Sequence, residues 1–401
     1  MIEDYSKIIV IHPGTQHAFR LANALATSFP TIQVKFYTWF ITSTRSHLSK
    51  IWPFNRRVVR IHDKVIIKNF LLFEVALLFH KKLKTLLSIP NNNNPYYIWQ
   101  TIFGFFLLPI LFINRKKTAL IIFETCGWPI VKYAQKWKIP VVMEFSAISH
   151  ESAASLGIGE TILGIKIKSS ERRYINYGFN CSKFAANTYN GKTSAKRHYP
   201  IWLGTDFKSN SNTTKIVTNK LICCCIGNSE KIKGIDILLE AFNAIKNKEK
   251  LLYIIGNINC NWVKSYCKEK EIPLDKVILS GKIKHQDLKD YLVSKCINLH
   301  ILPSRFDSFG MVVPETMALG IPNIVSPYVG AGEMLQHGTD GYVMNTLSAD
   351  ELTKFIYEYI NLSDECKVNL SMAALKKAEQ MTWENYNERI KVIFEEILLE
   401  I

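Results

Sequence analysis

The chain of 401 residues is long enough for two α/β domains, each with its own buried core. Its hydrophobic content of 48% excludes a disordered or fibrous protein. The formal net charge is +16, and residues 1–200 alone carry 27 Lys/Arg against 9 Asp/Glu. We therefore expect the first half to meet an anionic partner, namely membrane lipid, a phosphorylated acceptor or nucleic acid. A generic solvated basic surface is the alternative.

Short apolar strands alternate with helices along the first half, which is typical of a parallel sheet covered by helices on both faces. The opening segment has two acids and only a short apolar run, so it is predicted to be a first strand and not a signal peptide. Predicted strands cover residues 8–11, 33–37, 119–123 and 141–145, and predicted helices cover residues 17–29 and 129–137.

The same alternation restarts after a polar stretch, residues 205–218, which is predicted to be a linker. Cys223, Cys224 and Cys225 lie in the apolar run that follows. They are predicted to be reduced strand residues, because the chain has no Cys/His spacing typical of zinc. Predicted strands cover residues 221–227, 250–256, 276–281, 296–304 and 321–327, and predicted helices cover 235–245, 310–320, 349–362 and 383–401.

This pattern predicts an α/β protein with two Rossmann-like parallel-sheet domains that face a central cleft. Open sheets of this kind bind ligands at the carboxyl ends of their strands. The predicted domains are residues 1–204 and 205–382, and a C-terminal helix, residues 383–401, is expected to cross back to the first domain.

The most informative stretch is residues 303–344. A strand ends at Pro303, and a loop with Asp307 leads to a predicted helix near Gly310, where backbone N–H groups without a bulky side chain suit a diphosphate. Glu315 follows Asp307 by eight positions, so the two carboxylates suit a sugar and a ribose. The alternative is a loop aspartate that caps the helix and a glutamate on a solvated face.

This stretch resembles the donor-site signature of glycosyltransferase family 4, in which a Pro-Ser strand end is followed by Glu-x7-Glu with Phe-Gly after the first acid. Here the first acid is an aspartate, and the glycine loop reads VGAGEM. The resemblance implies the two-domain GT-B fold, retention of configuration at the sugar, and ribose binding by Glu315. By the same resemblance the donor sugar and phosphates are held by Asp307, a catalytic candidate, and by Phe309, Gly310 and Met311.

Residues 225–242, CIGNSEKIKGIDILLEAF, resemble the segment of the same family that supplies cations to the diphosphate. Lys233 matches the lysine of that segment, and a surface lysine in a first helical turn is the alternative. Asn228 stands at the arginine position, and Lys231 is the candidate substitute cation. Gly281 lies in the loop that borders the nucleotide base in the family, residues 277–283.

Residues 12–17, HPGTQH, form the first turn between strand and helix. Gly14 is a donor-binding candidate because a glycine lets the backbone approach a ligand. Gln16 and His17 are candidates for the acceptor side, and a plain turn is the alternative. His150 lies roughly where many members of the family carry a histidine that reaches the donor sugar, which makes it a catalytic candidate. A loop histidine without a role is the alternative.

Two apolar runs, residues 70–79 and 96–113, each precede a cationic cluster. Apolar and aromatic runs beside cations are what an in-plane, peripheral membrane attachment requires. Buried core helices and a transmembrane helix are the alternatives.

We therefore expect a retaining glycosyltransferase that moves a sugar from a UDP- or GDP-sugar to a lipid-linked or surface-polysaccharide acceptor. No metal or other cofactor is expected, since Asp-x-Asp is missing from any suitable context. The expected location is cytoplasmic, with peripheral attachment to the inner face of the plasma membrane. The alternatives are an epimerase or phosphorylase on the same fold, or a nucleic-acid-binding protein. The chain carries no RNA or DNA motif, so nucleic acid is not an expected partner.

Overall fold

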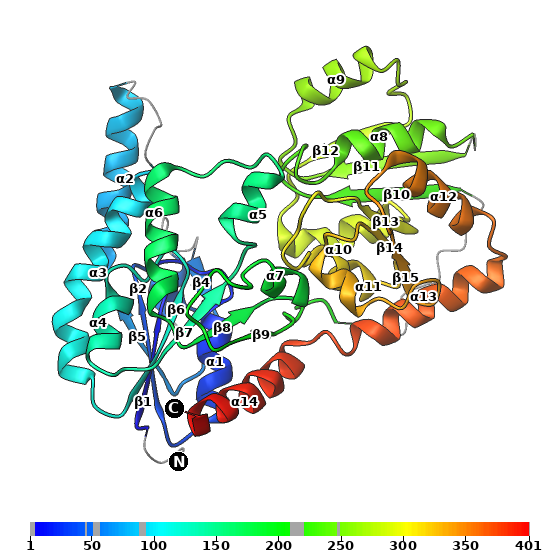
Figure 1. Cartoon of the computed structure of the whole chain (residues 1–401). Coiled ribbons are helices and arrows are strands. Elements are labelled where there is room, and N and C mark those ends of the chain that lie inside the picture. Colours follow the sequence, from blue (N-terminus) through cyan, green and yellow to red (C-terminus); the bar gives the residue numbers. More distant parts are fainter. Residues whose placement is uncertain are drawn as a thin grey trace. The chain divides into compact units, whose positions relative to one another are not determined.

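The computed structural model describes residues 5–44, 46–50, 57–87, 94–208, 220–246 and 249–400. The chain divides into two compact units, which are described separately (Figure 1). The first unit holds Met1–Ile201 together with Tyr386–Ile401, and the second holds Trp202–Asn385. Most of the predicted linker, from residue 209 onward, lies outside the described residues.

The first unit is built on a seven-stranded sheet in the order β5-β2-β1-β6-β7-β8-β9, in which every pair is parallel. Strands β6 and β7 are buried at every residue, which explains why their sequences are apolar except for Thr118 and Glu144. The strands are β1 Lys7–Ile11, β2 Gln33–Thr38, β5 Val65–Asn69, β6 Thr118–Phe123, β7 Val141–Phe145, β8 Tyr177–Asn180 and β9 Arg197–Pro200, with a separate short pair, β3 Thr42–Ser43 and β4 Val58–Val59.

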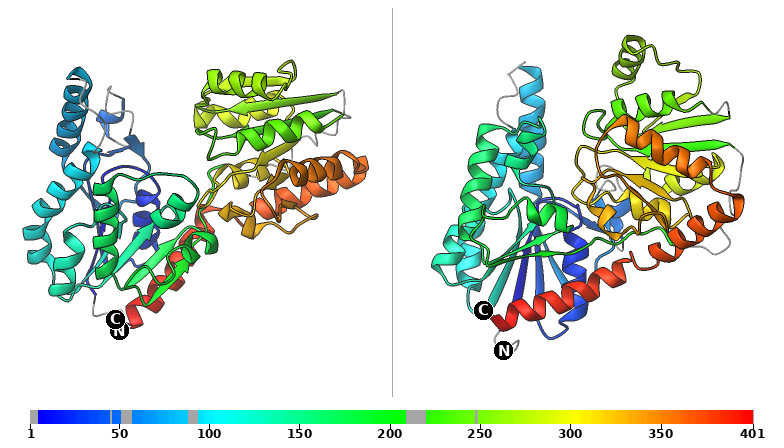
Figure 2. Two further views of the ribbon diagram at one scale, coloured as in Figure 1. Left: turned by 45° about the horizontal axis from the view of Figure 1, so that its top comes forward. Right: turned by 45° about the vertical axis from the view of Figure 1, so that its right-hand side comes forward.

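Helices cover both faces of this sheet, with α1 and α14 on one face and α3, α4 and α6 on the other (Figures 1 and 2). The last helix, α14, is fixed to the unit by the Tyr177 hydroxyl, which donates to Glu400 Oε2 at 2.7 Å, and by the ring of Phe394 against Phe29. The helices are α1 Ala18–Ser28, α2 Leu71–Leu86, α3 Pro95–Asn114, α4 Ile130–Lys136, α5 His150–Ser155, α6 Ile162–Glu171, α7 Lys183–Asn187 and α14 Trp383–Glu400, with 3₁₀ turns η2 His47–Lys50 and η4 Arg172–Tyr174.

The second unit has a six-stranded parallel sheet in the order β12-β11-β10-β13-β14-β15. Its strands are β10 Leu221–Ile226, β11 Lys250–Ile255, β12 Val277–Gly281, β13 Leu299–Leu302, β14 Asn323–Val325 and β15 Gly341–Val343. Its helices are α8 Ile235–Ala244, α9 Cys260–Glu269, α10 His285–Ser294, α11 Val312–Met317, α12 Ala349–Ile360 and α13 Asp364–Ala378, with the 3₁₀ turn η5 Gly330–Met334. The predicted α/β class with two parallel sheets is confirmed.

The three consecutive cysteines lie in the central strand β10 and are fully buried. All nine cysteines are free, and six of them are buried. Burial raises the pKa of Cys225 to about 12, so this thiol stays protonated and packs as a small apolar side chain. No group of three or more His, Cys, Asp or Glu side chains in the described residues has the arrangement of a metal site.

Candidate active site

The loop between β13 and α11 is held in place by the backbone of residues 328–331. The N–H of Asp307 donates to the carbonyl of Tyr328 at 2.8 Å, and its own carbonyl accepts from the N–H of Gly330 at 2.9 Å. Gly310 has φ +89°, and a Cβ there would lie 2.8 Å from Val329 Cγ1. A glycine is therefore required at this position for both conformation and space.

The helix after this loop is shorter than predicted. It spans Val312–Met317, whereas the sequence indicated residues 310–320. The left-handed conformation of Gly310 excludes it from the helix, and a second glycine with positive φ, Gly320, follows the helix end. The N–H groups of Gly310 and Met311 precede the first intrahelical donor, Val313. Phe309 is 3% exposed, so its side chain is closed to a ligand.

Lys233 and Asp307 form an ion pair, with Nζ and Oδ2 2.5 Å apart. Both side chains are about one-fifth exposed. The stem of Lys233 crosses Gly227, where an added Cβ would lie 2.6 Å from Lys233 Cγ. The structure therefore brings together the predicted phosphate cation and the predicted sugar ligand, and in this state each neutralises the other.

Glu315 projects from α11 and is paired with a residue that the sequence analysis missed. The carboxylate is 6% exposed, and its Oε1 lies 2.8 Å from Nε2 of His285, which is 58% exposed at the start of α10. This hydrogen bond raises the pKa of His285. The ring of Phe207 lies 5.3 Å from the imidazole. The position of His285, just after the loop predicted to border the base, was the only sequence signal for it.

Asn228 and Lys231 lie between β10 and α8, and the role of Lys231 as a substitute cation stays a prediction. Asn228 Oδ1 accepts the N–H of Asn257 at 3.0 Å, so this amide joins two loops. Lys231 is exposed, and its carbonyl accepts from Arg305 Nη1 at 2.7 Å.

Arg305 was not predicted, although it lies between the strand end and Asp307. Its two terminal nitrogens pair with the two carboxylate oxygens of Asp236 at 2.8 and 2.5 Å. Its backbone N–H donates to the carbonyl of Ile232 at 2.8 Å. Arg305 therefore ties the loop of Asp307 to the segment that carries Lys233, a positioning task that suits a rigid guanidinium.

Gly281 ends β12 with φ +68° and is exposed. Its carbonyl accepts the N–H of Gly256 at 2.9 Å, and a Cβ on Gly281 would meet nothing within 4 Å. The backbone conformation, not the available space, therefore favours glycine here. Its placement beside a nucleotide base remains a prediction.

In the first unit, His17 precedes α1 and pairs with Glu144 at the end of β7, with Nε2 and Oε1 2.9 Å apart. Both side chains are largely buried, at 11% and 5% exposure. Gln16 is the more open neighbour, and its Oε1 accepts from the hydroxyl of Ser146 at 3.4 Å. The carboxyl edge of the sheet thus carries a histidine–carboxylate pair next to an accessible amide.

His12 and Gly14 are bonded to each other in the same turn. The N–H of Gly14 donates to Nδ1 of His12 at 3.0 Å, and burial lowers the pKa of His12 to about 4, so the imidazole is neutral. A Cβ on Gly14 would lie 3.6 Å from the imidazole, which is ordinary contact. The structure therefore does not require a glycine at position 14.

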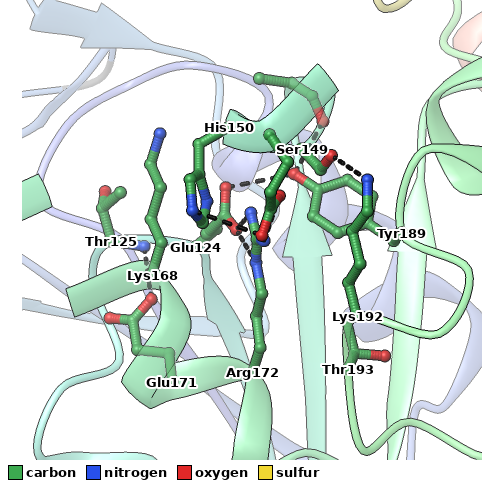
Figure 3. Close-up of polar contacts among 12 residues, drawn as sticks. Glu124, Thr125, Ser149, His150, Lys168, Glu171, Arg172, Tyr189, Lys192 and Thr193 are labelled. Atoms are coloured by element: carbon green, nitrogen blue, oxygen red, sulfur yellow. Dashed lines mark hydrogen bonds and ion pairs between the residues drawn. The ribbon is translucent and has the colours of Figure 1, made fainter. Parts of the chain in front are cut away.

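His150 begins α5 beside a buried charge cluster (Figure 3). Its Nε2 lies 3.3 Å from Glu151 Oε1, and burial lowers its pKa. Arg172 is 2% exposed; its Nε donates to Glu124 Oε1 at 2.8 Å and its Nη1 to Glu151 Oε2 at 3.0 Å. The guanidinium lies 4.7 Å from the ring of Tyr189. The cluster fixes the carboxyl ends of β6 and β7 around a neutral histidine.

Residues 206–378 match the sequence model of the family described as glycosyl transferases group 1. This match covers nearly all of the second unit, Trp202–Asn385. The chain is also 24% identical over 182 residues to a sucrose synthase of Melioribacter roseus, covering 40% of this chain and 23% of the relative. It spans about a third of a sucrose synthase from Zea mays. The chain thus covers a minor part of these relatives.

Solved structures resemble this chain over nearly its whole length. HepE from Anabaena, in complex with UDP-glucose, has a TM-score of 0.63 at 14% identity and covers 97% of this chain and 99% of its own. WaaG, a glycosyltransferase involved in lipopolysaccharide biosynthesis, has a TM-score of 0.62 at 12% identity and covers 96% of this chain and 99% of its own. At these identities the likeness shows the fold, which is the predicted GT-B fold.

Proposed function

We propose that the chain is a retaining glycosyltransferase that uses a nucleotide diphosphate sugar. The observation that carries the proposal is the meeting of Lys233, Asp307 and the Gly310 turn at the carboxyl edge of the sheet, within a glycosyl transferase domain. A cation and free backbone N–H groups suit a diphosphate, and a carboxylate suits sugar hydroxyls. The complex of HepE with UDP-glucose supports a donor of this class.

On this proposal, donor binding breaks the ion pair between Lys233 and Asp307 and adds the ribose to the pair between His285 and Glu315. The diphosphate takes Lys233 from Asp307, which leaves the Asp307 carboxylate for the sugar hydroxyls. The ribose hydroxyls donate to Glu315 beside His285. The Lys233 ammonium passes from a carboxylate to phosphate oxygens, and the Asp307 carboxylate accepts hydrogen bonds from sugar hydroxyls, so neither charged group is left without a polar partner.

The reaction step breaks the bond between the anomeric carbon and the diphosphate oxygen. A bond forms between the same carbon and the acceptor oxygen, on the same face of the sugar. The hydroxyl proton of the acceptor passes to the departing phosphate oxygen. Lys233 and the N–H groups around Gly310 stabilise the charge that develops on the diphosphate.

We also propose that the reaction needs no metal, because a lysine and backbone N–H groups supply the positive potential. Transfer rates that persist in excess EDTA are expected. Loss of activity in EDTA that returns with Mg²⁺ would overturn this part of the proposal.

For the acceptor, we propose a hydroxyl on a lipid-linked or surface-polysaccharide saccharide, used by a cytoplasmic enzyme at the inner face of the plasma membrane. The basic first half and the likeness in fold to WaaG support this class. The polar groups at the carboxyl edge of the first sheet, with Gln16 the most accessible, are the proposed acceptor contacts.

The deciding experiment is a binding panel of UDP, GDP, ADP and inorganic diphosphate, followed by donor turnover with and without saccharide acceptors. A ligand at 100 times its Kd stabilises the protein by about 2.7 kcal/mol, which thermal unfolding detects. We expect one nucleoside diphosphate to bind and its sugar to be transferred only when an acceptor is present. Donor conversion without an acceptor would indicate an epimerase, and no nucleotide binding at all would exclude the proposal.

A further inference from the structure

Exposed apolar side chains gather on one part of the first unit. Of the 21 large hydrophobic residues that are exposed in the described residues, 14 lie on α2, on the residue that follows it, and on α3. Two more, Ile162 and Ile165, lie on α6, which contacts α3 (Figure 1). The 14 residues are Leu71, Leu72, Val75, Leu78, Phe79, Leu83, Leu86, Leu87, Ile98, Ile102, Phe105, Phe106, Phe112 and Ile113.

Helix α3 has two different apolar faces. Phe103 and Leu107 are fully buried, and the ring of Phe103 packs against those of Phe70 and Phe73. The opposite stripe, at positions 98, 102, 105, 106, 112 and 113, is exposed over the full length of the helix. An ordinary core helix would bury its apolar face and expose polar residues, so the exposed stripe is in excess of what the fold needs.

By length and composition, α3 is long and apolar enough to cross a membrane. Spanning would, however, pull Phe103 and Leu107 out of the core of the unit. The geometry therefore favours a helix that lies along an apolar surface while its other face stays packed on the protein.

The charged residues around this patch are almost all positive. Residues 70–117 carry six Lys/Arg and a single acid, Glu74. That acid is paired with Arg57, with Nη2 and Oε1 2.9 Å apart. The basic residues lie in two groups, at 81–84 near the end of α2 and at 115–117 just after α3.

These positive charges favour one kind of partner for the apolar patch over another. A second copy of the chain would bring the same positive groups together, and like charges oppose such pairing. An anionic bilayer instead offers an apolar interior to the leucines and phenylalanines and phosphate groups to the lysines.

We propose that the exposed faces of α2, α3 and α6 form a docking face that lies in the plane of an anionic lipid bilayer. Helix α2 starts where β5 ends and continues past that edge of the sheet (Figures 1 and 2). A bilayer on this face lies beside the carboxyl edge that carries His17 and Glu144. Presentation of a lipid-carried acceptor to that edge rests on the proposed function, whereas the docking itself does not.

The test is co-sedimentation of the full chain with vesicles of phosphatidylcholine alone or mixed with phosphatidylglycerol. The apolar variant is Leu72→Gln/Phe79→Gln/Ile113→Gln, at sites that are 76%, 68% and 77% exposed, so folding should persist. Its matched control, Val392→Gln/Leu399→Gln, removes side chains that are 63% and 66% exposed on α14.

The charge variant is Arg115→Gln/Lys116→Gln/Lys117→Gln. Its control is Lys264→Gln/Lys268→Gln/Lys376→Gln, which removes three exposed lysines from the second unit. Wild type and both controls should bind the anionic vesicles in a salt-sensitive way, and the two patch variants should bind at least tenfold more weakly.

Binding of the apolar variant at the level of wild type would show charge attraction without insertion and would overturn the proposal. The proposal would also be overturned if wild type formed a dimer and did not bind vesicles, and if the apolar variant were a monomer. The patch would then be an interface between two copies of the chain. Nucleoside diphosphate binding is measured on the same proteins. A wild type that binds nucleotide but not the anionic vesicles therefore removes this inference alone, and a wild type that binds the vesicles but no nucleotide removes only the proposed function.

Discussion

His285 Nε2 and Glu315 Oε1 lie 2.8 Å apart and join an exposed imidazole to a buried carboxylate. The two residues are 30 positions apart and come from different helices, α10 and α11. The contact means that the predicted ribose ligand is already oriented before any nucleotide arrives. Orientation before binding lowers the entropy cost of holding a ligand.

Replacement of His285 by glutamine should change how stability depends on pH. The pKa of His285 is raised from 6.5 in the folded protein, so its contribution is fully present below pH 6.5 and is lost as the pH rises through the raised value. The gap in unfolding free energy between wild type and His285→Gln should therefore be larger at pH 5.5 than at pH 9. Because the imidazole is exposed, the gap should stay below about 1 kcal/mol. Urea unfolding at the two pH values measures it, and a gap that grows with pH would contradict the charge pairing.

Glu315→Gln should weaken nucleoside diphosphate binding roughly ten- to a hundredfold, since a hydrogen bond to a charged group is worth about 1.5–3 kcal/mol. Inorganic diphosphate, which has no ribose, should bind as it does to wild type. Isothermal titration with both ligands checks the split. Glu365→Gln, at an exposed glutamate of α13, is the control. An equal loss of affinity for nucleoside diphosphate and for inorganic diphosphate would show that Glu315 does not bind the ribose.

Lys233→Ala should weaken nucleoside diphosphate binding and leave nucleoside binding nearly unchanged, because the ammonium is a point charge suited to phosphate oxygens. Lys264→Ala, on the exposed face of α9, is the matched control. Isothermal titration of the nucleoside and of the nucleoside diphosphate into Lys233→Ala and Lys264→Ala measures the two affinities. If Lys233→Ala lowered the affinity for the nucleoside as much as that for the nucleoside diphosphate, Lys233 would not be a diphosphate ligand.

Asp307→Asn should lower turnover much more than it changes nucleoside diphosphate affinity. The substitution releases Lys233 from its carboxylate partner at 2.5 Å, so the diphosphate no longer competes with an ion pair. We expect the affinity to stay level or to rise. Steady-state kinetics with titration of the product nucleotide test this, and a joint fall of affinity and turnover would contradict the assignment.

Arg172→Met should destabilise the first unit by about 3–5 kcal/mol, because it leaves a buried carboxylate of Glu124 without its cation. The double variant Glu124→Gln/Arg172→Met should recover part of the loss. Arg173→Met, at the exposed neighbour, should have little effect. Chemical denaturation of the three proteins measures the differences, and equal effects at positions 172 and 173 would show that the cluster has no structural role.

Much of the fold was accessible from periodicity alone. The mostly apolar runs of β1, β6, β7 and β10 indicated parallel strands, because strands covered on both faces bury nearly every side chain. The end of α11 was predicted three residues too late, since proline and glycine signals at a short helix do not locate its last turn.

For the site, the sequence indicated Lys233, Asp307 and Glu315 through a motif whose order along the chain is specific. It did not indicate that the first two are partners, nor that His285 and Arg305 complete the arrangement. Those contacts join residues 30 to 74 positions apart, and no local pattern encodes them.

The sequence by itself determined the two parallel sheets and the glycine turn that follows Asp307, because strand burial and a glycine turn are properties of short segments. Only the tertiary structure decided which charges neutralise one another and which faces of α2 and α3 remain uncovered. Both depend on how distant segments pack, and an apolar run such as residues 96–113 has the same letters whether its second face meets protein, water or lipid.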